Sequence, residues 1–157
     1  MRILEVGSGT PSKFHHQLES ENILHFDISH KAFHVEVVGD AHCLPFKDNS
    51  FQTVYVSHVL EHLEAPVKAI KEFKRVTNNI LILKIPNAGF YKWKNLASEH
   101  IYGWDQYTFR NLLDRYFDKV IINGSQRQIH RNFLVQFMMI VMRLFYGQEE
   151  FTAICYK

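Results

Sequence analysis

The chain has 157 residues, a length that suits one domain with a buried core. Its formal net charge is +2 and its Lys and Arg residues are scattered, which gives no support for nucleic-acid binding as the main role. The longest apolar stretch, residues 133–142, is too short to span a bilayer. Because a strand pattern follows Met1-Arg2 at once, we expect no secretory signal. Cys43 and Cys155 form no paired spacing, which favours free thiols in a reducing compartment. We therefore expect a cytoplasmic protein with a single domain over residues 1–157.

The N-terminal stretch joins an apolar run to a glycine turn. Residues 2–6 predict a strand, and Gly7-Ser8-Gly9 predicts a turn that passes close to a ligand, because glycine has no Cβ atom. Thr10-Pro11 suits the start of a helix over residues 12–19, whose unpaired N–H groups would face something polar. Short glycine patterns also occur at ordinary strand–helix turns, so the turn alone does not establish a nucleotide site.

The rest of the chain alternates between strand and helix patterns. Strands are expected at residues 23–28, 35–38, 52–57, 80–85, 119–123 and 151–156, and helices at 67–76, 106–116 and 131–146. The second and third strands are too close in sequence for a crossover helix, so either the second helix is reduced to a turn or the pairing there is irregular. Residues 44–51 are expected to form a loop, and Asn78-Asn79 to end the helix before them. The alternation predicts an α/β sheet, mostly parallel.

Polar residues gather where the predicted strands end. They are Glu5 with the glycine turn, Asp27, Asp40, Ser57-His58 and Asn87. In parallel sheets ligands bind at the carboxyl ends of the strands, and an acid that closes the second strand can accept hydrogen bonds from both ribose hydroxyls. A diphosphate is disfavoured, because Glu5 adds negative charge beside the turn and the third glycine of G-x-G-x-x-G is missing. The pattern favours a nucleoside cofactor that carries cationic groups.

Several blocks of the sequence resemble the class I S-adenosylmethionine-dependent methyltransferases. The resemblance is to a branch of small methyltransferases with an LPF…SF…VLEH middle, and it covers residues 2–120 in the correct order. The matching blocks are ILEVGSG at 3–9, FDIS at 26–29, VGDAHCLPFKDNSF at 38–51, VLEHL at 59–63, KEFKRV at 71–76, IPN at 85–87 and HIYGW at 100–104.

This resemblance implies a fold, a cofactor and a set of contacts. The implied fold is a three-layer Rossmann-like sheet with strand order 3-2-1-4-5-7-6, an antiparallel last strand and a reduced second helix. The implied cofactor is S-adenosyl-L-methionine, with the glycines passing its methionine part, Asp27 holding the ribose and Asp40 accepting from the adenine amino group. The implied cofactor-binding residues are Glu5, Gly7, Ser8, Gly9, Asp27, Ile28, Asp40, Ala41, Ser57 and His58.

The catalytic candidates are His58 and His62. Methyl transfer from a sulfonium is a direct displacement, so positioning supplies much of the acceleration and a base matters only when the acceptor must lose a proton. Both imidazoles suit such a base, and the alternative is that they are structural hydrogen-bonding residues, His62 above all. The segment also matches the H-x-x-E-H pattern of zinc peptidases, but it abuts a strand and Ala65-Pro66 follows, so we expect no metal site.

The sequence thus predicts a methyltransferase that acts on a small-molecule acceptor. The alternative is a protein that binds S-adenosylmethionine but is catalytically weak, a partner or regulatory subunit. The expected helix over residues 131–146 is apolar nearly all round, which favours burial against the sheet, with a homodimer interface or a hydrophobic-acceptor surface as the alternative. The aromatic loop at 90–104 is a candidate lid over the acceptor.

Overall fold

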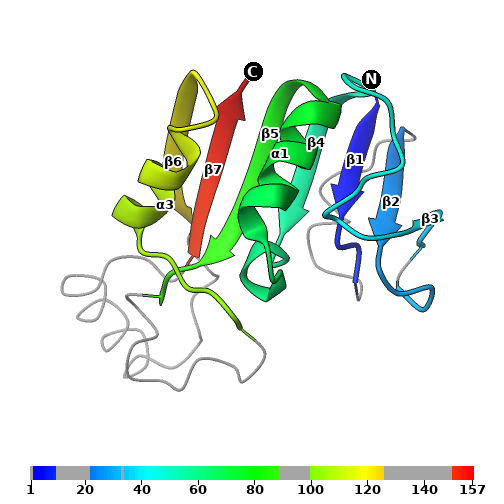
Figure 1. The fold of residues 1–157 in the computed structure, drawn as a ribbon, viewed down its shortest axis with the longest axis horizontal. Helices are drawn as coiled ribbons and strands as arrows, with labels where there is room; N and C mark the ends of the chain where they lie inside the picture. The colour runs from blue at the N-terminus through cyan, green and yellow to red at the C-terminus, as the bar shows by residue number, and fades with distance from the viewer. Residues whose placement is uncertain (1, 10–21, 33, 89–99, 126–149) are drawn as a thin grey trace, which may run out of the picture.

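The computed structural model describes residues 2–9, 22–32, 34–88, 100–125 and 150–157, which form a seven-stranded sheet of order β3-β2-β1-β4-β5-β7-β6 (Figure 1). The strands are β1 (Ile3–Val6), β2 (Ile23–Asp27), β3 (Val37–Val38), β4 (Phe51–Ser57), β5 (Thr77–Pro86), β6 (Lys119–Ser125) and β7 (Glu150–Tyr156). Strands β1 to β5 pair in parallel, whereas β7 runs antiparallel to β5 and β6. The predicted order and the antiparallel last strand are confirmed.

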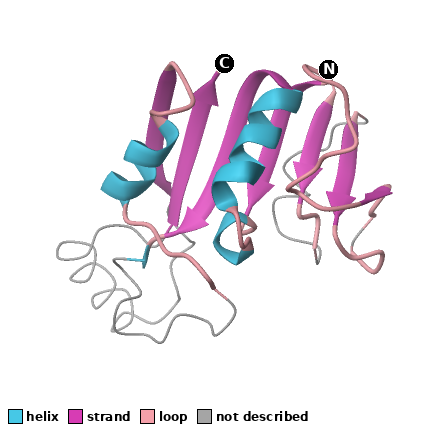
Figure 2. Cartoon of the chain, in the orientation of Figure 1, coloured by secondary structure: helices cyan, strands magenta, loops and turns pink. Residues whose placement is uncertain are grey.

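Two described helices, α1 (Pro66–Val76) and α3 (Gln106–Leu113), lie on the same face of the sheet (Figure 2). Pro66 opens α1 at a position where its missing N–H costs nothing. Its buried residues follow a helical period and cover β4 and β5: they are Pro66, Ala69, Ile70, Phe73 and Val76. Val67, expected on this face, is 37% exposed, because its position lies at the edge of the buried stripe.

The central strands supply the core. Leu4 of β1, Val54 of β4 and Leu81 of β5 are fully buried, as expected for parallel strands covered on both faces. Phe51, placed in a loop by its sequence context, instead begins β4 and is 1% exposed. Its ring packs edge-on against Phe46, so the residue is drawn into the sheet by burial of its side chain.

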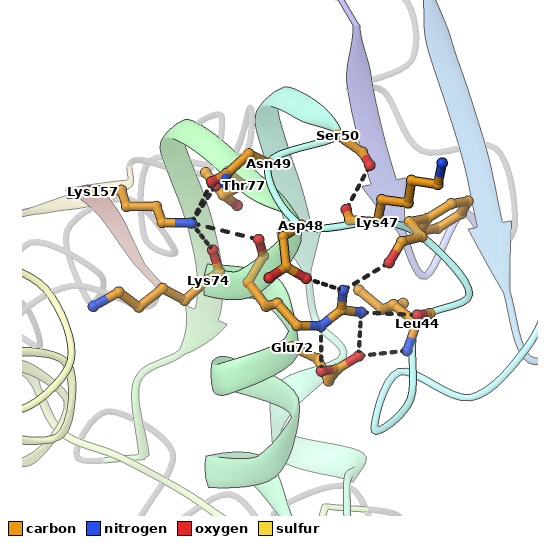
Figure 3. A network of polar contacts seen from close by, with 11 residues as sticks. Leu44, Lys47, Asp48, Asn49, Ser50, Glu72, Lys74, Thr77 and Lys157 are labelled. Carbon is orange, nitrogen blue, oxygen red and sulfur yellow. Dashed lines mark hydrogen bonds and ion pairs between the residues drawn. The ribbon is translucent and has the colours of Figure 1, made fainter.

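The loop before β4 is fastened to α1 by Arg75 (Figure 3). The guanidinium donates to both carboxylate oxygens of Glu72, to the Asp48 carboxylate and to the backbone carbonyls of Leu44 and Phe46, at 2.7 to 3.0 Å. The Arg75 side chain beside Glu72 lowers the pKa of that carboxyl. The Leu-Pro-Phe segment of the middle block therefore has a structural role: it lies on α1 and connects β3 to β4.

Lys157, the residue after β7, caps the C-terminal end of α1. Lys157 Nζ donates to the carbonyls of Lys74 and Thr77 and to Asn49 Oδ1 (Figure 3), where a cation also faces the negative end of the helix dipole. Strand β5 then begins directly at Thr77. The prediction that Asn78-Asn79 stands between helix and strand was wrong, because Thr77 already pairs with Phe51 of β4.

The remaining boundaries differ little from expectation. Helix α3 starts as predicted, with Asp105 and Thr108 forming a capping box, but it ends at Leu113 rather than at 116. Strand β3 is limited to two residues, and the described residues between β2 and β3, 28–32 and 34–36, contain no helix. The helices expected at 12–19 and 131–146 and most of the loop at 90–104 lie outside the described residues. No helix of the described ranges is long and apolar enough to cross a membrane.

Candidate functional site

The glycine turn after β1 is held by the end of β2. The amides of Gly7 and Ser8 donate to the carbonyl of Phe26, at 2.8 and 3.3 Å, and the Gly9 amide donates to Asp27 Oδ2 at 2.9 Å. The other carboxylate oxygen, Oδ1, accepts from the Ser29 amide at 2.8 Å. Asp27 is therefore the residue that fixes the turn, a role that strand-end spacing alone did not indicate.

Both glycines adopt backbone conformations that side chains oppose. Gly7 has φ of +79° and Gly9 has φ of +48°. A Cβ atom on Gly7 would lie 2.1 Å from Cγ2 of Val59. Among the described residues, a Cβ atom on Gly9 would meet nothing nearer than the Gly7 carbonyl oxygen at 3.8 Å. The turn thus packs directly on the segment after β4, which carries the histidine candidates.

Two features beside the turn favour a bound ligand. Ile28, directly after Asp27, is 77% exposed, although a large aliphatic side chain gains stability from burial. Ser8 is only 2% exposed, and its Oγ has no hydrogen-bond partner within the part of the chain that the structure describes. An exposed apolar side chain and a buried unsatisfied hydroxyl at one strand edge are both features that a bound molecule would resolve.

Glu5 lies next to the turn but is engaged with β2. Its Oε2 is 2.7 Å from Nδ1 of His25, the residue that pairs with Glu5 across the sheet. The side chain of Glu5 is buried. The pair holds the Glu5 carboxyl against β2 directly before the turn, and its role in orienting the turn stays a prediction.

Asp40 and Ala41 follow β3. Asp40 Oδ1 accepts from the backbone amide of His42 at 2.8 Å and lies 2.7 Å from its Nδ1, and these bonds lower the pKa of the Asp40 carboxyl. His42 Nε2 in turn accepts from the amide of Ala65 at 3.3 Å, which leaves the proton on Nδ1. Asp40 is exposed and ionised, and Ala41 beside it is buried.

His58, the residue after β4, lies between two carboxylates. Its Nδ1 is 3.2 Å from Glu61 Oε1 and its Nε2 is 3.3 Å from Glu150 Oε1. Hydrogen bonds to Glu150 and to Glu61 raise the pKa of His58 to about 9, against the opposing effect of burial. The imidazole is therefore protonated near neutral pH. A protonated imidazole cannot accept a proton, so His58 is poorly suited to act as a general base. Its φ of +54° shows that the backbone is held in the left-handed region.

Glu150 opens β7 and completes this arrangement with Lys84 of β5, whose Nζ lies 2.8 Å from Oε2. Burial alone would raise the pKa of Glu150, but hydrogen bonds from His58 and Lys84 lower it to about 2. Because β7 is antiparallel, its first residue meets the carboxyl ends of the parallel strands. Sequence reasoning missed Glu150; the antiparallel last strand was the signal that could have placed its start at this edge.

Glu61 and His62 belong to the short 3-10 helix η1 (Leu60–His62). Glu61 is 1% exposed, whereas His62 is exposed and its ring packs edge-on against His100, with centroids 4.8 Å apart. Asn87, at the end of β5, is buried and bridges to Trp104. The carboxyl edge therefore gathers the residues predicted from strand ends, together with Glu61, His100 and Glu150.

Comparisons with known proteins agree with this architecture. Residues 4–80 match a family model described as a methyltransferase domain. Demethylmenaquinone methyltransferase of Paenarthrobacter aurescens (strain TC1) is 35% identical over 68 residues, a region that covers 41% of this chain and 27% of that protein. The chain thus matches only about a quarter of the length of this curated relative.

Solved structures match over nearly the whole chain. A SAM-dependent methyltransferase from Archaeoglobus fulgidus has a TM-score of 0.70 at 19% identity, over 99% of this chain and 86% of that chain. A protein in complex with the Trm112 methyltransferase activator of Haloferax volcanii has a TM-score of 0.76 at 12% identity. The match covers 99% of this chain and 81% of that chain. The chain has the fold of class I methyltransferases. Residues 4–80, just under half of the chain, are similar to the methyltransferase domain family.

Proposed function

We propose that the chain binds S-adenosyl-L-methionine at the carboxyl edge of β1, β2 and β3 and transfers its methyl group to a small-molecule acceptor. The observation that carries the proposal is the glycine turn fixed by Asp27, with exposed Ile28 beside it. This turn lies where the strand order reverses, between β1 and β4, which is the place where open α/β sheets bind nucleotides.

The residues at this edge suit a nucleoside with a cationic tail. Each oxygen of the Asp27 carboxylate accepts one N–H bond and keeps a second lone pair for a ribose hydroxyl. Ile28 offers an apolar surface to adenine, and exposed Asp40 and the backbone of Ala41 suit its polar edge. The buried Ser8 hydroxyl, unsatisfied among the described residues, would gain a partner from the ligand.

The cofactor would supply an electrophilic methyl group on a sulfonium, so the protein has to hold and align rather than to generate the reagent. Gly7 and Gly9 let the backbone pass close to the methionine part, with Glu5 beneath the turn. Ser57 and His58 border the acceptor side at the end of β4. His58, protonated between Glu61 and Glu150, would orient polar groups there, which leaves His62 as the general-base candidate for an acceptor that must lose a proton.

A curated relative supports a small-molecule acceptor, since it is named for demethylmenaquinone, a small molecule, and is 35% identical over 68 residues. The second candidate function is a catalytically weak subunit that binds the cofactor and acts with a partner, and the structural neighbour found with the Trm112 activator supports keeping it. A homodimer through residues 131–146 stays a prediction, because that segment lies outside the described residues.

Two assays separate these functions. Isothermal calorimetry with S-adenosylhomocysteine measures the site itself, and transfer of a labelled methyl group to pools of small-molecule acceptors measures turnover. Binding with turnover supports the methyltransferase. Binding without turnover on any pool, with or without added cell extract, supports the catalytically weak subunit. No binding contradicts both functions. A 2′-deoxy analogue sharpens the ribose assignment: the wild type should bind it more weakly than the parent compound, whereas Asp27→Ala should bind the two equally.

A further inference from the structure

A second group of ligand atoms lies beside His58 at the same edge of the sheet. Glu61 and His62 come from η1, and His100 comes from the segment that precedes α3. Each of the three residues offers one ligand atom, a carboxylate oxygen or an imidazole nitrogen, and these atoms lie within 4.8 Å of one another. This metal-ligand cluster, Glu61 with His62 and His100, differs from the H-x-x-E-H pattern, because His58 is not one of its members.

Two polar atoms in the cluster are buried and unsatisfied. Glu61 Oε2 and His100 Nδ1 have no hydrogen-bond partner in the ranges that the structure describes, and the Glu61 side chain is only 1% exposed. An unsatisfied buried polar atom costs about 1–3 kcal/mol, and more where the group is charged. A cation between the residues would satisfy the carboxylate oxygen and an imidazole nitrogen at once.

The backbone already brings the two segments together. The amides of Ile101 and Tyr102 both donate to the carbonyl of Glu61, at 2.9 and 3.1 Å. The Glu61 carboxylate is oriented in turn by His58, whose Nδ1 lies 3.2 Å from Oε1 and leaves Oε2 to the cluster. Hydrogen bonds that fix a ligating carboxylate are typical of protein metal sites.

We propose that Glu61, His62 and His100 bind a divalent transition-metal ion of the zinc class. Two imidazoles and one carboxylate form a donor set that binds zinc in several enzyme classes, whereas Mg²⁺ and Ca²⁺ prefer oxygen ligands. Bonds of about 2.0–2.1 Å place tetrahedral ligand atoms about 3.3 Å apart, so these atoms have to approach by about 1.5 Å at most. Rotation of the exposed His62 side chain supplies such a movement without changing the backbone.

A metal ion at this cluster is incompatible with two of the expectations above. One is the sequence-based expectation that the chain has no metal site. The other is that His62 acts as a general base: in the metal-bound form one ring nitrogen binds the metal and the other already carries a proton. Three protein ligands leave a coordination position for water or for an oxygen atom of an acceptor. The proposal does not depend on methyl transfer, since metal binding is measured without the cofactor.

The test is metal binding by the full chain after treatment with a chelator. Zinc affinity is measured by competition with a chromophoric chelator, stoichiometry by elemental analysis, and coordination by the visible spectrum of the Co²⁺ form. The variants are His62→Ala and His100→Ala. The matched control is His30→Ala, which removes an exposed histidine elsewhere in a chain that has ten. Circular dichroism and thermal unfolding show whether each variant folds.

The expected result is one zinc ion per wild-type chain and intense tetrahedral Co²⁺ bands. Loss of a hydrogen-bond partner of a ligand already costs about 10–100-fold in metal affinity, so loss of a ligand in His62→Ala or His100→Ala should cost about 100-fold or more. The affinity of His30→Ala should stay unchanged. Because His62 is exposed, its replacement should leave the fold intact and keep the test decisive even if His100→Ala unfolds. Zinc binding that is absent in the wild type, or equal in His62→Ala and the wild type, overturns the proposal, whatever the outcome with S-adenosylhomocysteine.

Discussion

Replacing Gly7 by alanine should destabilise the chain more than the same change at Gly9. Both residues have positive φ, and an alanine held in the left-handed region costs about 1–2 kcal/mol. At Gly9 we expect little further cost, because the nearest atom of the described residues lies 3.8 Å from the new methyl group. At Gly7 the methyl group would also lie 2.1 Å from Val59 Cγ2, and overpacking of this kind adds about 1–3 kcal/mol. We expect about 2–5 kcal/mol for Gly7→Ala.

Urea unfolding of both variants measures this difference, and Val59→Ala identifies its source. Removing the Val59 methyl groups clears the space that the alanine needs, so the double variant Gly7→Ala/Val59→Ala should be less destabilised than the sum of the single variants by about 1–3 kcal/mol. Equal stability of Gly7→Ala and Gly9→Ala, or strict additivity with Val59→Ala, would refute the claim that the turn packs against the segment after β4.

Three further predictions concern the rest of the described structure. Arg75→Lys should destabilise the chain by about 2–3 kcal/mol in urea unfolding, because one ammonium cannot replace a guanidinium with five hydrogen bonds, whereas exposed Arg115→Lys should change little. The pKa of Glu150 falls from 4.5 to about 2 on folding, which contributes about 3 kcal/mol to the free energy of unfolding. This stabilisation is present above pH 4.5 and lost as the pH falls toward 2, and Glu150→Gln should remove this acid dependence. Burial raises the pKa of Cys155 to about 12, so only exposed Cys43 should react with a thiol reagent in the native protein.

Each of these three has a clear contrary outcome. Arg75→Lys as stable as Arg115→Lys would mean that the loop before β4 holds its position without the guanidinium. An acid unfolding profile of Glu150→Gln that parallels the wild type would contradict the buried pairing with His58 and Lys84. Two thiols reacting at the same rate before denaturation would contradict the burial of Cys155.

Most of the strands and the starts of the helices followed from the sequence, because they depend on local signals. An apolar run before a glycine marked β1, an apolar run that ends in an acid marked β2, and an alternating β-branched run marked β4. The resemblance supplied the order in which they pair. The helical spacing of apolar residues marked α1. Pro66 and Asp105 account for where α1 and α3 start, because capping and the missing proline N–H act within a single turn.

The chemistry of the histidines did not follow from the sequence, because it depends on residues that are distant in the chain. The high pKa of His58 requires Glu150, which reaches it only through the antiparallel pairing of β7 with β5. The cluster of Glu61 and His62 requires His100, which two backbone hydrogen bonds hold against η1. No spacing pattern within one segment contains these contacts.

The boundary between α1 and β5 shows the same limit. Asn78-Asn79 is a good local signal for a helix end and turn, yet both residues lie in β5. Pairing of Thr77 with Phe51 and the closure of the helix by Lys157 override that preference, and both contacts come from elsewhere in the chain.

The central claim, a nucleoside site built around Asp27, is tested most directly by calorimetric titration with S-adenosylhomocysteine. Wild type, Asp27→Ala and the control Asp118→Ala, which removes an exposed acid remote in sequence from the turn, are compared under identical conditions. The account predicts binding at one site per chain, a loss of about 1–3 kcal/mol in Asp27→Ala, and no change in Asp118→Ala. A wild type that binds no S-adenosylhomocysteine, or an Asp27→Ala variant that binds it as tightly as the wild type, would contradict the account.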